Sequence, residues 1–390
     1  MDPFTHTFVG LAAAKAGLER MSPLATTVCV LAANSPDSDI VVAFITDRWN
    51  YLHHHRGITH SIIGVIALAI IVPSLVWAVE LAYSRWRQTR PRARYRWLFL
   101  VSAIVTATHP LMDWTNNYGI RPFLPWSSRW YYGDLVFIVD PFILLLAGGA
   151  AFLGTEGTRR KMVRWTAVAT AFIVLSFVFG WRRGPDLAGA NVARIILLGG
   201  TIVLIAVRRF RLSRGRERLI AATALAVIVV YWCGLGLVHR TAYRQAQEVA
   251  DRAATGLDER LLRVAAMPTL ANPLQWQCVA ETDKAIYRYW VNLPASDNSQ
   301  PVVDGYRADG AEAIERYEKP TGHEQEIAAR ASSDRRARIL ADFARFPLAH
   351  VPDQDCISQT IVQFADLRYT EPGANRSPFS VNVPVECASK

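Results

Sequence analysis

The chain has 390 residues, 51% of them hydrophobic, and a formal net charge of +10. A positive charge of this size can indicate nucleic-acid binding, but the basic residues lie in short loops between long apolar runs, so we exclude nucleic acid as a partner. None of the five cysteines forms a Cys-x-x-Cys motif, which argues against a thiolate zinc site.

The apolar runs are confined to the first part of the chain, whereas the rest has the composition of a soluble, charged domain. We therefore predict a mainly α protein, with a polytopic α-helical membrane domain at residues 1–240 and a small α+β soluble domain at residues 241–390. The N-terminus lacks the basic region of a signal peptide, so we expect no cleavable leader.

Two short apolar segments, residues 4–18 and 22–33, open the chain. Each is shorter than the about 20 residues that a membrane-spanning helix needs. We expect a tilted or re-entrant helical hairpin whose two ends return to one face of the membrane. Two buried core helices are the alternative.

Longer apolar runs follow this hairpin and predict about six membrane spans. The second of them continues directly into a polar segment that begins at His109. The predicted spans are residues 61–81, 97–108, 135–153, 165–181, 193–207 and 219–238.

Short basic loops predict the orientation of these spans. Arginines crowd into residues 84–97, 155–164 and 207–218, and short basic loops next to spans are typical of the cytoplasmic side. The alternation of spans then places residues 53–60, residues 109–134 and the C-terminal domain on the outer side. The first hairpin would bring its own polar ends to the same side.

The C-terminal domain shows mixed periodicities. An apolar stripe predicts an amphipathic helix over residues 241–267, and two alternating segments around a short Asp-Lys turn predict a pair of strands. The predicted strands are residues 276–282, 285–293, 357–369 and 379–385, and a further helix is predicted over residues 336–346. An oxidising outer compartment would permit one disulfide among Cys278, Cys356 and Cys387.

Histidines and aspartates gather at the predicted outer ends of the spans. Imidazole nitrogen and carboxylate oxygen without thiolate suit Zn²⁺, Mn²⁺ or Fe²⁺. His109 and Asp113 are four residues apart, so they share one face of a helix, although Pro110 between them predicts a kink. Together these separate segments predict a divalent metal site at one membrane face. The residues are His6, Asp37, Asp39, His53, His54, His55, His60, His109, Asp113, Asp134 and Asp140.

Several of these residues have two interpretations. Asp37 and Asp39 supply a ligand and a general base, or cap the apolar run that follows. Arg56 either anchors to a lipid phosphate or orients a substrate phosphate or carboxylate by a bidentate contact. Asp140 lies inside an apolar run, so we expect it to hold a ligand histidine by a hydrogen bond. Asp134 is assigned the same supporting role, with a helix cap as the alternative.

The sequence resembles, at these residues, the YdjM/YbcI-type family of inner-membrane proteins, which are described as metal-dependent hydrolases. The resemblance is specific over residues 1 to about 145 and looser beyond. The motifs that carry it are Met1-Asp-Pro-Phe-Thr-His6, Asn34-Ser-Pro-Asp-Ser-Asp39, His55-Arg-Gly-Ile-Thr-His-Ser61, His109-Pro-Leu-Met-Asp-Trp-Thr-Asn-Asn-Tyr-Gly119, Arg121-Pro-Phe-Leu-Pro-Trp-Ser and Arg129-Trp-Tyr-Tyr-Gly-Asp134.

The resemblance implies a multi-pass hydrolase of the bacterial inner membrane that depends on a divalent metal. The metal or catalytic positions that it implies are His6, Asp37, Asp39, His55, His60, His109 and Asp113. Because the family motif begins at His55, we assign His54 a supporting role and treat His53 as an ordinary interfacial residue. Spaced His and His-x-x-x-Asp ligands are also similar to those of zinc-dependent phospholipase C, which suggests a phosphoester substrate by analogy.

These observations predict a membrane-embedded hydrolase that acts on a lipid-linked or membrane-proximal phosphoester at the outer face. Zinc is the expected metal, with manganese or iron as alternatives. Asp37, Asp39 and Arg56 are the predicted catalytic residues.

Three other functions remain open on the same residues. The first is a non-catalytic metal-binding or transport protein, and the second is a scaffold with a structural metal. The third is haem ligation by His109 with either His54 or His60.

Overall fold

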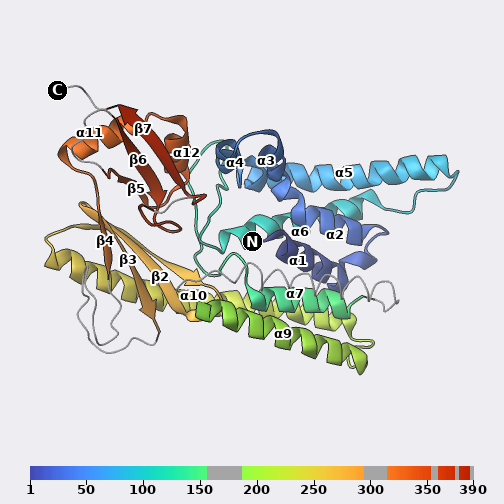
Figure 1. Ribbon diagram of the computed structural model, residues 1–390. Coiled ribbons are helices and arrows are strands. Elements are labelled where there is room, and N and C mark those ends of the chain that lie inside the picture. The colour runs from blue at the N-terminus through green and yellow to red at the C-terminus, as the bar shows by residue number, and fades with distance from the viewer. Residues whose placement is uncertain (156–186, 294–313, 353–358, 374–376, 387–390) are drawn as a thin grey trace. The chain divides into compact units, whose positions relative to one another are not determined.

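The computed structural model describes residues 1–155, 187–293, 314–352, 359–373 and 377–386 (Figure 1). The predicted span at residues 165–181 lies outside these ranges, as do Cys356 and Cys387. The described chain divides into two compact units. The first comprises Met1–Ile40, Arg56–Leu237 and Pro268–Pro273, and the second comprises Val41–His55, Val238–Met267 and Leu274–Lys390.

The first unit is helical. Its elements are α1 (Pro3–Ala16), η1 (Leu18–Arg20), α2 (Ala25–Asn34), η2 (Ser35–Ile40), η3 (Ile58–His60), α5 (Ile62–Trp86), α6 (Tyr95–Trp114), α7 (Pro141–Leu153), α9 (Leu187–Arg209) and the first half of α10 (Glu217–Gly256). The predicted short hairpin is therefore present as α1 and α2, joined by residues 17–24, which begin at Gly17 with φ of 146° and include η1.

Local capping signals explain where several of these helices begin. The carboxylate of Asp2 accepts a hydrogen bond from the amide of Thr5, and Pro3 occupies the first position of α1. The hydroxyl of Ser61 caps α5 in the same way. The predicted span at residues 135–153 is shorter than expected, because α7 begins only at Pro141, after its cap Asp140.

Four helices within the described ranges are long and apolar enough to cross a membrane. They are Ala25–Ile45, Ile62–Trp86, Gly189–Arg209 and Glu217–Gly256. On α5 a row of large apolar side chains is exposed, including Ile66 and Leu75. Such an exposed apolar surface is costly in water and suits contact with lipid.

Arginine-bearing loops meet at one end of this helical unit. Arg218, at the start of α10, donates from Nε to the carbonyl of Ala16 at the end of α1, at 3.0 Å. The amide of Arg94, just before α6, donates to Ser22 Oγ at 2.9 Å, and Arg208 donates to carbonyl groups at the end of α7. The start of α1, the end of α2, the start of α5 and the end of α6 therefore lie at the opposite end of the unit.

The second unit is α+β, as predicted. It contains α3 (Val41–Ile45), α4 (Arg48–His54), the second half of α10, β1 (Leu261–Thr269), β2 (Asn272–Thr282), β3 (Ala285–Asn292), β4 (Glu315–Glu318), α11 (Gly322–Ala331), α12 (Arg335–Phe343), β5 (Pro347–His350), β6 (Gln359–Asp366) and β7 (Ser380–Glu386). The strands form one sheet in the order β1-β2-β3-β4 and a second in the order β5-β6-β7.

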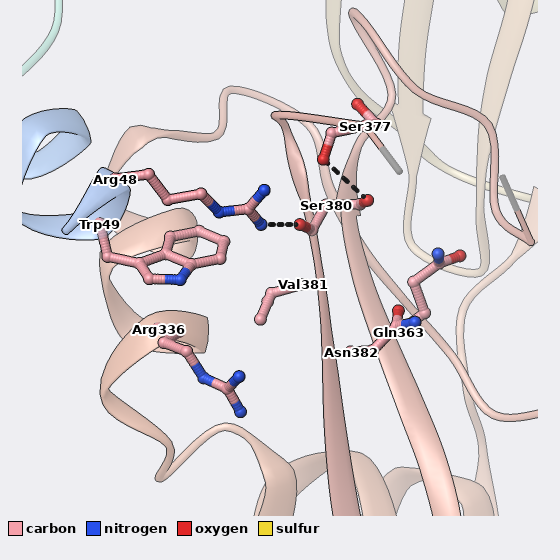
Figure 2. A pocket seen from close by; sticks show the side chains of 8 residues that line it. All are labelled: Arg48, Trp49, Arg336, Gln363, Ser377, Ser380, Val381 and Asn382. Carbon is pink, nitrogen blue, oxygen red and sulfur yellow. Dashed lines mark hydrogen bonds between the residues drawn. The ribbon is translucent and has the colours of Figure 1, made fainter. Parts of the chain in front are cut away.

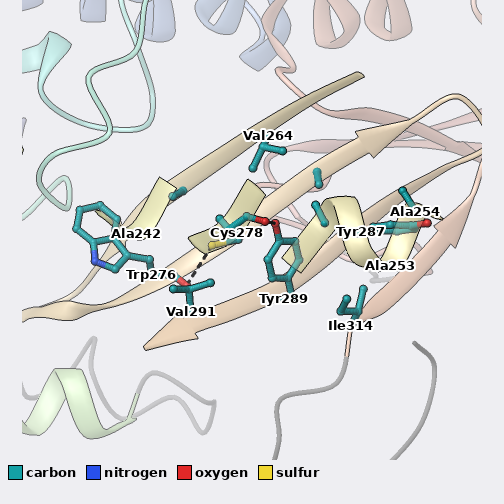
Figure 3. Close-up of a cluster of buried hydrophobic side chains, with 14 of the residues drawn as sticks. Ala242, Ala253, Ala254, Val264, Trp276, Cys278, Tyr287, Tyr289, Val291 and Ile314 are labelled. Atoms are coloured by element: carbon teal, nitrogen blue, oxygen red, sulfur yellow. Dashed lines mark hydrogen bonds between the residues drawn. The ribbon is translucent and has the colours of Figure 1, made fainter. Parts of the chain in front are cut away.

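The β2–β3 hairpin confirms the predicted pair of strands around the Asp-Lys turn. The strands are antiparallel, with Glu281 opposite Ile286 at the turn end of the ladder. Small residues of α10 pack on this sheet around Trp276 and Tyr289, both fully buried (Figure 3). Tyr289 Oη donates a hydrogen bond to the carbonyl of Ala246 at 2.6 Å, which ties the sheet to the helix.

One predicted helix is confirmed over residues 241–256 and wrong beyond them. The amphipathic helix expected over residues 241–267 ends at Gly256, and a turn with Asp258 at φ 54° leads into strand β1. Leu261 and Val264 therefore belong to a strand. The apolar spacing in this stretch fits a helix, but pairing of β1 with β2 in the sheet overrides it.

Candidate metal centre

Four side chains from three elements converge at the end of the first unit that lies away from the arginine-bearing loops. Asp37 comes from η2, His60 from η3, and His109 and Asp113 from one face of α6. One ligand atom of each lies within 4.8 Å of the others. His60, His109 and Asp113 are buried, whereas the side chain of Asp37 is 19% exposed.

The distances between the donor atoms resemble those of a coordination shell. His60 Nε2 and His109 Nε2 are 3.1 Å apart. Asp37 Oδ1 lies 3.5 Å from the first and 3.4 Å from the second, and Asp113 Oδ2 lies 3.3 Å and 3.5 Å from them. Ligands at about 2.0–2.1 Å from a tetrahedral zinc ion are separated by about 3.3 Å. The spacing therefore fits a small divalent ion.

Both imidazoles are oriented by neighbours on their far sides. His109 Nδ1 lies 2.6 Å from the carbonyl oxygen of Ala33, and because a carbonyl can only accept, Nδ1 carries the proton and Nε2 presents its lone pair to the centre. His60 Nδ1 lies 3.6 Å from Asp39 Oδ2 and 3.2 Å from Thr59 Oγ1. Burial lowers the pKa of His60 to about 3, so the ring is neutral at pH 7, as a metal ligand must be.

Arg56 fixes the position of Asp113. Its Nη2 donates to Asp113 Oδ1 at 3.0 Å, and its Nη1 donates to Asn116 Oδ1 at 3.0 Å and to the carbonyl of Gly119 at 3.2 Å. The guanidinium also lies 4.6 Å from the centre of the Tyr118 ring. Arg56 is buried. Its planar guanidinium connects the segment just before η3 to the end of α6 and the loop after it.

The backbone of Arg56 carries a second contact to the cluster. Its φ is 52°, in the left-handed region, and its amide donates to Asp39 Oδ2 at 2.8 Å. Asp39 is therefore held between the Arg56 amide and His60, which places it behind a ligand imidazole instead of among the four converging donors.

His6 closes the other side of the cluster. Its ring stacks on His109, with centroids 3.7 Å apart and planes 14° from parallel. His6 Nε2 lies 3.3 Å from Asp113 Oδ1, which the Met1 amino group also contacts. Within the described residues, His6 Nδ1 and Asp113 Oδ2 are buried without a hydrogen-bond partner.

The cluster passes a simple chemical test for a metal site. A buried polar atom without a hydrogen bond is costly, and one such atom, Asp113 Oδ2, belongs to this set of imidazole nitrogens and carboxylate oxygens. A divalent cation satisfies such a set and balances the two carboxylates, Asp37 and Asp113. The residues present therefore fit a bound divalent metal.

The other histidines of the stretch at residues 53–60 belong to the second unit. The ring of His55 stacks on Tyr51, with centroids 4.8 Å apart. His53 and His54 are exposed and contact each other edge to face. None of the three is among the four converging donors.

The two remaining predicted aspartates have structural contacts. Asp140 caps α7 by accepting from the amides of Phe142 and Ile143, and it also accepts from Tyr231 Oη at 3.0 Å. Asp134 is buried in the loop after α6, with φ of 52°. The amide that follows Asp134, that of Leu135, donates to Thr115 at 2.7 Å, so this loop folds back on the end of α6.

Two groups that organise the site had no predicted role. Asn116 is fully buried, and its Oδ1 accepts from both Arg56 and the amide of Tyr118. It lies in the motif after Asp113, so the motif offered a signal. The Ala33 carbonyl that orients His109 left no signal, because a backbone group has no sequence signature.

Comparison with known proteins supports the resemblance stated from the motifs. Residues 1–184 match the model of the family described as YdjM inner membrane protein, which confirms the resemblance for that part of the chain. Over 155 residues the chain is 29% identical to a Bacillus subtilis (strain 168) protein named "Uncharacterized protein YfhP". That alignment covers 37% of this chain and 43% of the relative, so the chain spans less than half of the relative's length. No solved structure matches the chain.

Proposed function

We propose, on the premise that residues 1–184 are of the YdjM inner membrane protein family, that this membrane protein is a metal-dependent hydrolase. The observation that carries the proposal is the convergence of Asp37, His60, His109 and Asp113 within 4.8 Å. Hydrolytic zinc sites in proteins are built from the same donors, histidine nitrogen and carboxylate oxygen.

In this proposal His60, His109 and Asp113 hold the metal, which leaves a position for water, and His6 is an additional neighbour of Asp113. A divalent ion, zinc by preference, would supply Lewis acidity toward a phosphoryl oxygen and lower the pKa of water. The chain's own contribution is to bury both imidazoles, which disfavours their charged form, and to turn their rings toward the cluster through Ala33 and Asp39.

Asp37 is the proposed general base. A base must lie within hydrogen-bond reach of the water whose proton it takes. Asp37 alone among the four donors has an appreciable exposed fraction, 19%, so water and substrate reach the cluster past its carboxylate. Asp39 is already engaged by the Arg56 amide, so its proposed role is to position His60.

Arg56 is proposed as a positioning residue for Asp113. Its guanidinium is buried and bound to Asp113, Asn116 and Gly119, so those contacts compete with a substrate phosphate. Holding Asp113 by a planar fork restricts the carboxylate to one orientation toward the imidazoles.

The proposed substrate is a lipid-linked or membrane-proximal phosphoester at the outer face of the bacterial inner membrane. The arginine-bearing loops mark the cytoplasmic end by the positive-inside rule, and the cluster lies at the other end of the helical unit. The exposed apolar side chains of α5, whose first turn follows His60 directly, offer a lipid-facing surface beside that end.

The test is a hydrolysis screen with the full-length protein purified in a neutral detergent. Phosphomonoesters, phosphodiesters and lipid phosphates are offered to the wild type, to Asp37→Asn and to the control His323→Ala, an exposed histidine of the second unit. We expect metal-dependent hydrolysis of at least one class, lost by at least about 100-fold in Asp37→Asn and kept in the control. A protein that binds metal but hydrolyses nothing would favour the non-catalytic alternative.

A further inference from the structure

The second unit contains a pocket of about 390 Å³ that the proposed hydrolase chemistry does not use (Figure 2). Its walls come from α4, α12, β6 and β7, together with the segment just before β7. The lining residues are Arg48, Trp49, Arg336, Gln363, Ser377, Ser380, Val381 and Asn382. They include two arginines, four hydroxyl or amide side chains, and no acidic residue.

Arg48 gives the pocket a positive charge that no carboxylate balances within the described residues. Its guanidinium lies 4.2 Å from the centre of the Trp49 ring, and its Nη2 donates to the Ser380 carbonyl at 3.0 Å. These contacts hold the side chain rigid without neutralising it. Figure 2 shows it reaching from α4 toward the strand that carries Ser380 and Val381.

The neighbouring arginines are each matched by an aspartate. Arg336 is paired with Asp334 through Nε at 3.1 Å and Nη2 at 3.0 Å, which leaves Nη1 for another acceptor. Arg335 is paired with Asp47 at 3.3 Å and so joins α12 to α4. Arg335 and Arg336 are therefore neutralised by Asp47 and Asp334. The charge of +1 on Arg48 is left over.

We propose that this pocket binds the phosphate group of a small organic phosphate. Guanidinium groups from two helices can contact one oxyanion together, and the hydroxyl and amide groups of Ser377 and Asn382 supply further donors. A volume of about 390 Å³ exceeds that of a bare phosphate and lies in the range of small-molecule pockets. Trp49 and Val381 form an apolar wall for the organic part.

A lipid headgroup and a soluble phosphate ester share this chemistry. The proposal rests on the second unit alone and does not depend on metal binding or hydrolysis by the first. Its failure and the failure of the proposed function are therefore separate results.

The experiment is calorimetric titration of the full-length protein in neutral detergent with three probes. Glycerol 3-phosphate represents a soluble ester, dihexanoyl phosphatidic acid a lipid headgroup, and dihexanoyl phosphatidylcholine a zwitterionic control. The variants are Arg48→Gln, which removes the unbalanced charge, and Asn382→Asp, which adds an opposing charge on exposed β7 surface without disturbing the Arg48 contact. Arg338→Gln on the same helix as Arg336 is the matched control, since Arg338 is exposed and does not line the pocket.

We expect at least one phosphate probe to bind, and to bind about tenfold or more weakly in both pocket variants, because a lost charge-assisted hydrogen bond has about that effect. Binding of phosphatidic acid alone assigns a lipid headgroup, and binding of glycerol 3-phosphate alone assigns a soluble ester. The proposal is overturned if neither phosphate probe binds, or if Arg338→Gln weakens binding as much as Arg48→Gln.

Discussion

The guanidinium of Arg56 holds the end of α6 and the loop that follows it in place. It is buried, and it donates to acceptors on three residues at the end of α6 and in the following loop, Asp113, Asn116 and Gly119. A buried charge is tolerated when its partners are in place and becomes costly when one is removed. The contacts of Arg56 therefore predict a structural effect of mutation, separate from any effect on substrate.

Arg56→Ala is expected to destabilise the first unit by roughly 3–5 kcal/mol, because Asp113 and Asn116 lose their buried partner. Arg56→Lys keeps the charge without the planar fork and should recover only part of this loss. Thermal unfolding in detergent measures both variants. A normal unfolding temperature together with a raised KM would instead favour the substrate-orienting role.

The packing of α1 against α2 helps to position His109, one of the candidate metal ligands. α1 and α2 cross closely at Gly10, where an added Cβ would lie 2.7 Å from the carbonyl oxygen of Cys29 and 2.9 Å from Cβ of Ala33. Ala33 is also the residue whose carbonyl orients His109. Crowding at this crossing would therefore displace the Ala33 carbonyl and with it His109, a residue of the candidate metal centre.

Gly10→Ala is expected to cost about 1–3 kcal/mol through overpacking and to weaken metal affinity by displacing the Ala33 carbonyl. Gly199→Ala on α9 is the matched control, because nothing lies within 4 Å of its added Cβ. The control should be neutral or stabilising by about 0.5–1 kcal/mol, since alanine favours a helix. Equal unfolding temperatures for the two variants would show that the crossing is not tight.

The turn between α10 and β1 contributes Glu259 to a partly buried ion pair with a predictable pH dependence. Glu259 accepts from Thr282 and Tyr287 and pairs with Arg316 at 2.6 Å. Burial raises the pKa of Glu259, but these hydrogen bonds and the arginine lower it further than burial raises it, to below its ordinary value of about 4.5. The carboxylate therefore stabilises the fold above pH 4.5, and the stabilisation is lost as the pH falls through the lowered pKa.

Glu259→Gln is expected to destabilise the second unit at pH 7 by about 1–3 kcal/mol. The difference from the wild type should shrink as the pH is lowered below about 4.5. Hydrogen exchange of the β2 and β3 amides at several pH values measures this difference in stability. A difference that is constant with pH would exclude the ionised carboxylate as its source.

The orientation in the membrane is a property of the whole molecule. In a cysteine-free background, Ser128→Cys lies in the exposed loop after α6, and Thr89→Cys lies in the arginine-rich loop before it. The positive-inside rule predicts that an impermeant maleimide labels position 128 in intact cells and position 89 only after permeabilisation. The reverse pattern would put the candidate metal centre on the cytoplasmic side.

Much of this architecture is readable from the sequence, because long apolar runs and arginine loops are strong signals. The predicted spans at residues 61–81 and 193–207 are present as α5 and α9. The stretch after Gly256 was misassigned because apolar residues spaced for a helix also fit a strand once a sheet is there to pair with. The short helices α3 and α4 were missed because five to seven residues carry little periodicity.

The candidate site was predictable in composition and less so in geometry. The sequence indicates the histidines and aspartates as candidates, because ionisable groups are costly to bury near a membrane and are usually functional there. It does not distinguish His55 from His60, five residues apart, because the turn between them decides which ring enters the cluster. Nor does it reveal that the Asp39 carboxylate is held by the Arg56 amide.

The metal content of the purified protein tests the central claim most directly. Elemental analysis would compare the wild type with His109→Ala, Asp113→Ala and the control His323→Ala, all purified without chelator. We predict a stoichiometric divalent metal, zinc foremost, in the wild type and the control, and its loss from both cluster variants. Unchanged metal in His109→Ala and Asp113→Ala, or a wild type that binds no divalent metal when it is supplied, would contradict the account.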